Sequence, residues 1–261
     1  GSYTRFSNSP GKLDNWAFSP DGSKIAYAAG REVWDHAVSQ AYVMDITGGE
    51  PVNLSADIPY PTWDELDDHP QGLPPEAFPV WTEGDREVLI ADRYDLWVVD
   101  PTSGEARSLT EETGREQGIR FRYTSEEDDR RAAPRDGDIH LTAFHLTTKA
   151  SGIYRDRIQG TEPPRRVVYG DRAYSGLQKA EDADVWVHRW GTFQDYPELY
   201  VSDASLQDAR RMSETNPQQA EYSWGTAELT EWTSTDGIPL QGILYKPEDF
   251  DPSLEYPMMV Y

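Results

Sequence analysis

The chain repeats one arrangement of short β-strands and tight turns. The first copy begins with "NWAFSPDGSKIAYAA" at residues 15–29, where Asp21-Gly22 suits a hairpin turn that needs positive φ. A third strand is expected at residues 40–46, and the turn at Gly48-Gly49 leads to a short fourth strand at 51–55. Four short antiparallel strands with this turn chemistry predict one blade of a β-propeller.

The same order of strands and turns returns at residues 78–110, 119–169 and 174–213. Because one four-stranded sheet cannot bury both of its faces alone, neighbouring blades must stack on it. The sequence therefore predicts an all-β fold, with a partial β-propeller of about four four-stranded blades over residues 1–225. Rings typically contain four to eight blades, so the chain is expected to supply only part of one.

An aromatic residue followed shortly by Asp marks the third strand of each copy. Successive aromatics are 46 to 57 residues apart, near the roughly 40 to 50 residues of known blades. This spacing supports the division into blades. The pairs are Tyr42 and Asp45, Trp97 and Asp100, Tyr154 and Asp156, and Tyr200 and Asp203.

Two insertions interrupt the repeats. Residues 58–77 hold five prolines and an acidic run, which predicts an excursion between blades. Residues 125–138 are dominated by charge and are expected to form an exposed hairpin tip or a disordered loop.

The character of the sequence changes after Asn216. In residues 227–261 two strands flank Asp236-Gly237, a proline-containing link comes next, and a last apolar strand begins at Met258. The pattern "W(T)S.DG.PL.G.LYKP.DFDP...YPM.VY" resembles the junction of S9-family serine peptidases, the prolyl oligopeptidase and dipeptidyl peptidase group. There a propeller leads into an α/β-hydrolase domain. The resemblance implies that residues 226–261 are that junction and the first strands of a truncated hydrolase domain.

The blade "PVWTEGDREVLIADRYDLWVVDP" at residues 79–101 also looks like large bacterial members of that group. The resemblance further implies where the catalytic residues of such a parent protein lie. In the family the nucleophile lies on a G-x-S-x-G elbow, with Asp and His after it. No G-x-S-x-G occurs in this sequence, and the last histidine, His188, precedes the junction. We therefore expect no catalytic residue and no cofactor site in this chain. Its role would be to gate or position short peptides, with the intramolecular hydrolase domain as its partner.

A TolB-like propeller that binds other proteins without catalysis is the alternative. The phrase "SPDGSKIAY" at residues 19–27 is shared by TolB-like and peptidase propellers, so it does not distinguish them. A pure propeller would end by completing its last blade. The strands after residue 226 favour the peptidase.

Charge and composition exclude several classes of partner. The chain has 24 Lys and Arg against 47 Asp and Glu, a net charge of −23, which repels nucleic acid and anionic membrane surfaces. No apolar stretch reaches the roughly 20 residues of a membrane helix. The absence of cysteine excludes disulfides and thiolate metal sites. The lysine-poor acidic composition resembles that of proteins from salt-loving organisms, although an ordinary soluble surface also explains it. A periplasmic or secreted parent is favoured over a cytoplasmic one.

Histidines and acidic clusters are the candidate metal ligands. The five histidines are scattered over expected strands and loops, and His140 and His145 should face opposite sides of one strand. The clusters Asp64 to Asp68 and Glu126 to Asp129 could attract Ca²⁺, but neither has the D-x-D-x-D-G spacing. Solvated charge is the favoured interpretation, and no metal site is expected. The histidines are His36, His69, His140, His145 and His188.

Paired glutamates and paired arginines are the candidate peptide-binding groups. In dipeptidyl peptidases paired propeller glutamates hold the substrate's amino terminus, and Glu111-Glu112 and Glu126-Glu127 are the pairs available here. Their surroundings do not match the family's motif, so a polar loop is favoured. Arginine pairs could clamp a carboxylate, but pairing with the abundant acids is expected. The pairs are Arg130-Arg131, Arg165-Arg166 and Arg210-Arg211.

Overall fold

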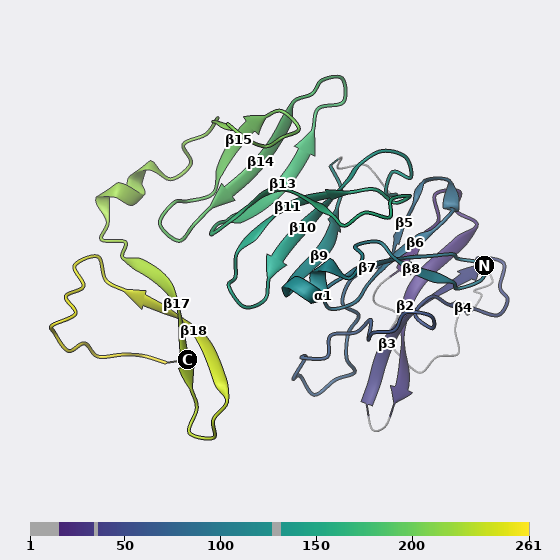
Figure 1. Cartoon of the computed structure of the whole chain (residues 1–261), viewed down its shortest axis with the longest axis horizontal. Helices are drawn as coiled ribbons and strands as arrows, with labels where there is room; N and C mark the ends of the chain where they lie inside the picture. Colours follow the sequence, from purple (N-terminus) through teal and green to yellow (C-terminus); the bar gives the residue numbers. More distant parts are fainter. Residues whose placement is uncertain (1–15, 34–35, 127–131, 261) are drawn as a thin grey trace, which may run out of the picture.

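The computed structural model describes residues 16–33, 36–126 and 132–260. The described chain forms four four-stranded antiparallel sheets followed by a two-stranded hairpin (Figure 1). Helical structure is limited to short segments, and the described residues include no helix long and apolar enough to cross a membrane. The predicted all-β fold, a partial propeller of four blades, is confirmed.

Each blade uses four strands that are consecutive in the sequence. Blade 1 contains β1 (Trp16–Phe18), β2 (Lys24–Val33), β3 (His36–Asp45) and β4 (Val52–Asn53). Blade 2 contains β5 (Val80–Trp81), β6 (Val88–Ala91), β7 (Leu96–Val99) and β8 (Ala106–Ser108). Blade 3 contains β9 (Ile119–Thr124), β10 (Ile139–His145), β11 (Ser151–Asp156) and β12 (Arg165–Gly170). Blade 4 contains β13 (Ala173–Lys179), β14 (Trp186–Gly191), β15 (Glu198–Ser202) and β16 (Arg210–Arg211).

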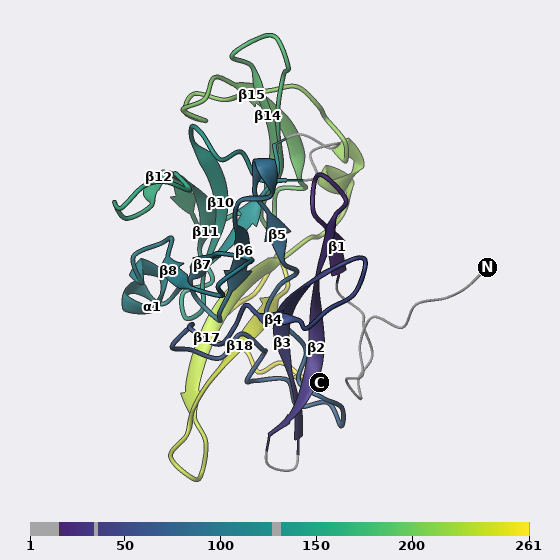
Figure 2. The same cartoon turned by 90° about the vertical axis from the view of Figure 1, so that its right-hand side faces the viewer.

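Successive blades lie side by side (Figures 1 and 2), and hydrophobic cores lie between them, as the stacking argument predicts. Blades 1 and 2 share a cluster around Trp81 and Trp97, and blades 2 and 3 share one around Leu89 and Phe121. The buried core between blades 3 and 4 is much smaller, with only Ile153, Leu177, Trp186 and Leu206. Burial of apolar area supplies most of the folding free energy, so blade 4 is the least firmly anchored of the four.

The predicted turn chemistry is visible in the first hairpin of blade 1. Gly22 has φ of +72°, which a glycine adopts without strain. Asp21 accepts hydrogen bonds from the Ser19 hydroxyl at 2.7 Å and the Ser23 amide at 2.8 Å. The Asp21 amide in turn donates to the carboxylate of Asp85 at 3.1 Å, so the matching turns of blades 1 and 2 are tied together.

The recurring Asp after the third strand has a structural role in three blades. Asp45, Asp100 and Asp203 each accept the backbone N–H two residues later, at 2.7 to 2.9 Å, and so fix the turn into the fourth strand. Asp156 is different, because it lies two residues after Tyr154, accepts the amide of the next residue, Arg157, and is buried. Asp156 therefore ends its strand as Asp45 does, but it does not form the same turn hydrogen bond.

Residues 58–77 form the predicted excursion between blades 1 and 2, without a named strand. The excursion is nevertheless packed against the blades. Ile58 is buried in the core between blades 1 and 2, and the ring of Tyr60 lies 6.1 Å from that of Trp97. An isolated bridge also pairs Leu73 with Val38 of β3.

The second insertion, residues 125–138, corrects an expectation. We expected an exposed or disordered loop, but Ala132 and Ala133 are buried. The Ala133 amide donates to the carbonyl of Trp81 at 2.7 Å, and its carbonyl accepts the Glu83 amide at 2.9 Å. Two small apolar residues within the charged segment thus add backbone pairing beside β5. Residues 127–131 lie outside the described residues.

The chain leaves blade 4 through a 3₁₀ segment, η2 (Pro217–Glu221), and enters the hairpin of β17 (Thr226–Thr233) and β18 (Pro239–Lys246). Gly225 opens this hairpin with φ of +75°, and a Cβ there would lie 2.2 Å from the Lys246 carbonyl oxygen. Only glycine fits that close approach. The remaining helical segments are η1 (Glu83–Asp85) and α1 (Thr113–Gln117).

Candidate functional site

The histidines whose side chains are described do not converge on one site. His140 and His188 are buried on the second strands of blades 3 and 4, whereas His145 accepts the amides of Thr147 and Thr148 in its own turn. His140 Nδ1 is bonded to the carboxylate of Glu126, and its ring lies 4.8 Å from that of Trp186. These contacts are those of core and turn histidines. The side chain of His36 lies outside the described residues.

His188 belongs to a column of stacked rings in blade 4. Its ring lies 5.9 Å from Tyr200, which lies 4.7 Å from Trp190, and the Arg172 guanidinium covers Trp190 at 4.0 Å. Burial lowers the pKa of His188, and its Nδ1 has no hydrogen-bond partner. His188 therefore serves as a neutral packing residue.

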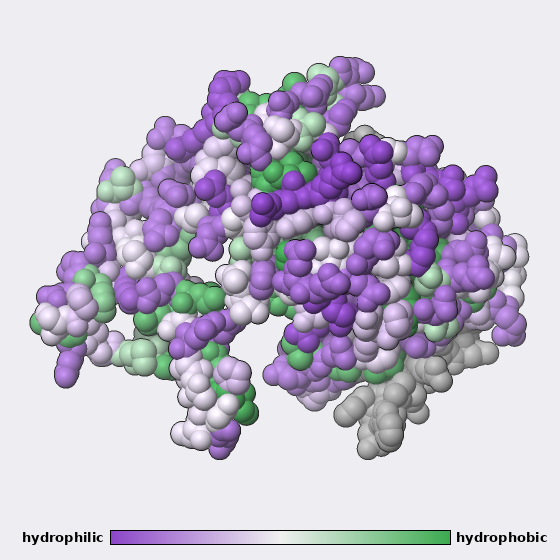
Figure 3. Space-filling model, viewed as in Figure 1, coloured by the Kyte–Doolittle hydropathy of each residue, from purple (hydrophilic) through white to green (hydrophobic). Residues whose placement is uncertain are grey.

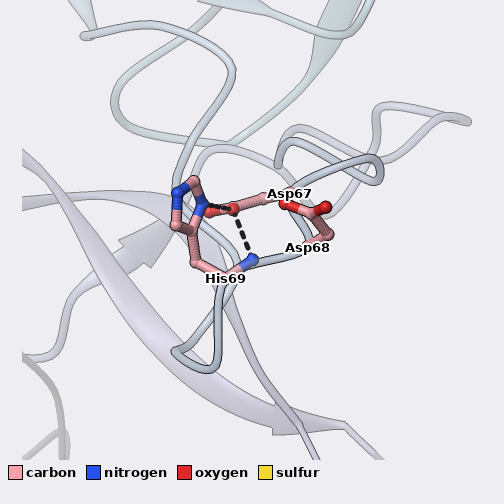
Figure 4. A group of neighbouring side chains, drawn as sticks. All are labelled: Asp67, Asp68 and His69. Carbon is pink, nitrogen blue, oxygen red and sulfur yellow. Dashed lines mark hydrogen bonds and ion pairs between the residues drawn. The ribbon is translucent and has the colours of Figure 1, made fainter. Parts of the chain in front are cut away.

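Asp67, Asp68 and His69 form the one group among the described residues whose ligand atoms come close enough to hold a metal, within 4.8 Å of one another (Figure 4). The Asp67 carboxylate is already engaged by the His69 ring, the His69 amide at 3.0 Å and the Gln71 side chain at 3.1 Å. These bonds lower the pKa of Asp67 to about 2, and the carboxylate raises the pKa of His69. The arrangement stabilises the loop through an ion pair between His69 and Asp67.

This ion pair predicts a measurable titration. In Asp67→Asn the pKa of His69 should fall towards its ordinary value of about 6.5, because the anionic hydrogen-bond acceptor is lost. Proton–nitrogen NMR of the imidazole against pH reports the change. Asp68→Asn is the matched control, since it removes the same charge one residue away, and should shift the pKa of His69 by less. Equal shifts in the two variants would contradict the pairing.

Neither glutamate pair presents two free carboxylates. Glu111 and Glu112 both have left-handed backbone angles, with φ of +50° and +55°, at the entrance to α1. The Glu112 carboxylate accepts the Tyr60 hydroxyl at 2.6 Å. Glu126 is occupied by His140, and Glu127 lies outside the described residues. As far as their side chains are described, these two pairs form no double-carboxylate clamp for an ammonium group.

A buried network of two aspartates contacts the start of α1 and was not predicted from the sequence. Asp95 accepts the amides of Gly114 and Arg115 at 2.8 and 2.9 Å and the Thr110 hydroxyl at 2.6 Å. Asp92 accepts the Trp97 indole N–H at 3.0 Å, and the Arg115 guanidinium lies 3.4 Å from it. The only hint of this network in the sequence is the pair Asp92 and Asp95, which begin and end one short turn. The network fixes the connection between blades 2 and 3.

The arginines of the candidate pairs differ in whether they form an ion pair. Arg211 forms an ion pair with Glu198 at 2.6 Å, as the expected pairing with acids predicts. Arg165, Arg166 and Arg210 are exposed on the last strands of blades 3 and 4. The pair Arg130-Arg131 lies outside the described residues.

A pocket of about 570 Å³ lies where blade 4 meets η2 and the segment after β18; we call it the junction pocket. Its size is that of a small-molecule or peptide side-chain site. At its base Glu198 accepts bonds from Ser213, Thr215 and Arg211, which hold its pKa below the ordinary value. The carboxylate of Glu198 is thus engaged within the protein, while the rest of the lining is both aromatic and polar. The aromatic lining residues are Trp190, Tyr196, Tyr200, Tyr222 and Trp224.

Sequence reasoning missed the junction pocket because its walls come from strands, a 3₁₀ segment and a tail spread over about 60 residues. None of the lining residues forms a motif with another. The residues that line the pocket include no serine, cysteine, lysine or histidine.

No protein-family model and no curated protein matches the chain. Several solved structures match the chain. Puromycin hydrolase matches with a TM-score of 0.56 at 17% identity, over 93% of this chain and 35% of that one. A mutant of the same enzyme in complex with PGG matches with a TM-score of 0.53 at 16% identity and the same coverage. TolB from Acinetobacter baumannii matches with a TM-score of 0.45 at 13% identity, over 90% of this chain and 52% of that one.

The present chain therefore spans about a third of the length of puromycin hydrolase and about half that of TolB. At these identities the likeness concerns the fold. Together with the four sheets and their stacked cores, it identifies the chain as a partial β-propeller.

Proposed function

We propose that this chain is the propeller portion of an S9-type serine peptidase, and that it gates or positions short peptides for an α/β-hydrolase domain outside the chain. The sequence resemblance at residues 227–261 motivates the proposal, and the fold likeness to puromycin hydrolase supports it. In this proposal residues 1–225 are the propeller, and residues 226–261 are the junction with the first strands of the hydrolase domain.

The observation that carries the proposal is the exposed apolar surface of the β17–β18 hairpin. Trp232 is 49% exposed, Tyr245 53% and Ile243 60%, although they lie in paired strands. Figure 3 shows hydrophobic residues at the surface of this region, in the lower left of the view. An isolated two-stranded hairpin is marginal in water, so apolar side chains on it favour a further domain packed there.

Two contacts connect the hairpin to blades 3 and 4. The Tyr245 ring lies 5.2 Å from Phe193 of blade 4, and the Gln241 side chain donates to the Thr147 carbonyl of blade 3 at 3.2 Å. The junction pocket opens beside the same hairpin and includes Glu248 from the segment after β18. In the parent it would lie at the domain boundary, where a peptide side chain could be held.

The rival interpretation is a TolB-like propeller that binds a protein partner. It shares the blades and the "SPDGSKIAY" phrase, so the two hypotheses differ in the chain beyond the hairpin. A gene product extending past residue 261 distinguishes them. A G-x-S-x-G within roughly the next two hundred residues supports the peptidase, and a stop codon shortly after residue 261 supports the rival.

Activity gives the direct test. The present chain should not cleave Ala-Pro or Gly-Pro chromogenic peptides, whereas a product that includes the hydrolase domain should cleave a short peptide. Replacing the serine of its G-x-S-x-G by alanine should abolish that cleavage, since removing the nucleophile costs many orders of magnitude in rate. Cleavage by the present chain alone, at a rate that survives repurification, would overturn the assignment.

A further inference from the structure

A second pocket, of about 550 Å³, lies between blades 2 and 3; we call it the interblade pocket. Its floor comes from β5, β6 and β7 of blade 2, and one wall comes from β9, the first strand of blade 3. The segment that leads into β5, residues 75–78, completes the rim. The volume falls within the range of sites for small organic ligands.

The floor of the interblade pocket is apolar and firmly held. Leu89, Ala91 and Leu96 line it, and all three are buried members of the core between blades 2 and 3. At the rim the ring of Phe78 is 62% exposed. An apolar group entering here would remove water from both the floor and this ring.

The wall from β9 carries two arginines with different surroundings. Arg122 is neutralised, because its Nη2 lies 2.6 Å from the Glu76 carboxylate and its Nη1 donates to the Phe121 carbonyl at 2.7 Å. Arg120 is exposed and lies over the ring of Phe144 at 5.5 Å. Among the described residues no carboxylate forms an ion pair with it.

The lining therefore has one cation in excess: Arg120 and Arg122 against Glu76. The chain as a whole carries a net charge of −23, with about two acids for each base. The charge of Glu76, which pairs with Arg122, also acts on Arg120, but the Arg120 guanidinium makes no ion pair of its own with it and lies beside an apolar pocket. Its guanidinium fork matches the two oxygens of a carboxylate.

We propose that the interblade pocket binds a small carboxylate with an apolar body, whose hydrocarbon part lies on the floor and whose carboxylate meets Arg120. A hydrophobic C-terminal residue of a short peptide and a free aromatic acid share this chemistry. The proposal concerns the blades alone and stands whether or not the protein also has a hydrolase domain.

Titration of the present chain with four probes tests the proposal. The probes are N-acetyl-L-phenylalanine, 3-phenylpropanoate and the neutral amide of each, with binding measured by calorimetry or NMR at a fixed salt concentration. Each acid should bind about tenfold more tightly than its amide, which corresponds to about 1.4 kcal/mol. Tighter binding of N-acetyl-L-phenylalanine would identify a peptide terminus as the ligand source, and tighter binding of 3-phenylpropanoate a free acid.

Two variants locate the site. Arg120→Gln should remove the preference for acid over amide, whereas Arg165→Gln, an equal charge change at an exposed position of blade 3, should leave it intact. Ala77→Phe, which places a ring at the pocket lining, should weaken acid and amide alike while the circular dichroism spectrum stays unchanged.

Three results would overturn the proposal. One is equal affinity of the chain for acid and amide. Another is an equal effect of Arg120→Gln and Arg165→Gln, which would indicate only long-range attraction. The third is no binding of either acid up to about 10 mM, a concentration at which even weak sites of roughly millimolar affinity are occupied.

Discussion

Replacing Trp81 by alanine is expected to lower the free energy of unfolding by about 3 to 5 kcal/mol. Trp81 is fully buried in the core between blades 1 and 2, and its indole N–H donates to the Ala17 carbonyl at 3.1 Å. Truncation would leave a cavity between the blades and a carbonyl without its donor. A domain of this kind is stable by roughly 5 to 15 kcal/mol, so the loss is a large fraction of the total.

Urea denaturation followed by circular dichroism measures this loss. Trp232→Ala is the matched control, because the same side chain is removed from the exposed hairpin, where the cost should stay below about 1 kcal/mol. Trp81→Phe should fall between the two, since it keeps most of the apolar volume and loses the hydrogen bond. If Trp81→Ala and Trp232→Ala cost the same, the core between blades 1 and 2 does not stabilise the fold in the way described.

Trp81 also shows how the second insertion is tied to the blades. Its carbonyl accepts the amide of Ala133, so one residue of β5 contacts β1 through its side chain and the insertion through its backbone. Loss of the ring should therefore loosen residues 132–133 as well. Faster amide hydrogen exchange at Ala133 in Trp81→Ala would report that coupling.

The blades were predictable because their signals are local. A turn such as Asp21-Gly22 and a strand such as residues 24–29 lie within one stretch of sequence, and each copy repeats them. Stacking of the blades results from the need to bury both faces of each sheet. Thus the element order and the all-β class could be derived from the sequence before any contact between blades was known.

The pockets and buried polar groups were not predictable, because they depend on which residues of different blades meet. Arg120 and Glu76 lie 44 residues apart, and only the fold brings them to one cavity. Ala133 lies in a segment whose charge predicts exposure, yet two small residues suffice to dock it beside β5. Local composition sets the average behaviour of a segment, while single backbone pairings decide where it lies.

Asp156 belongs to a repeated sequence pattern, but its environment depends on the fold. In sequence it resembles Asp45, Asp100 and Asp203, whose turn hydrogen bonds lower their pKa. In the structure it is buried, one carboxylate oxygen has no partner, and the other accepts the Arg157 amide at 2.7 Å. Burial, with the nearby charge of Glu111, raises the pKa of Asp156 from 3.8 to about 7.

The raised pKa fixes the sign of a pH effect. Between about pH 4 and pH 7 the folded state holds the Asp156 proton and the unfolded state does not, so this residue lowers stability as pH rises. The slope is at most about 1.4 kcal/mol per pH unit, and the loss is complete above the folded-state pKa. Below pH 4 both states are protonated, and the contribution vanishes.

Asp156→Asn should therefore stabilise the protein more at pH 8.5 than at pH 5, because the neutral amide avoids the cost of a buried charge. Melting temperatures of wild type and variant at the two pH values measure the difference. Asp203→Asn is the matched control: its pKa is lowered in the fold, so its small destabilising effect should be the same at both pH values. A gain in Asp156→Asn that does not grow with pH would show that Asp156 is ionised in the folded protein throughout this range, and that its surroundings solvate the charge.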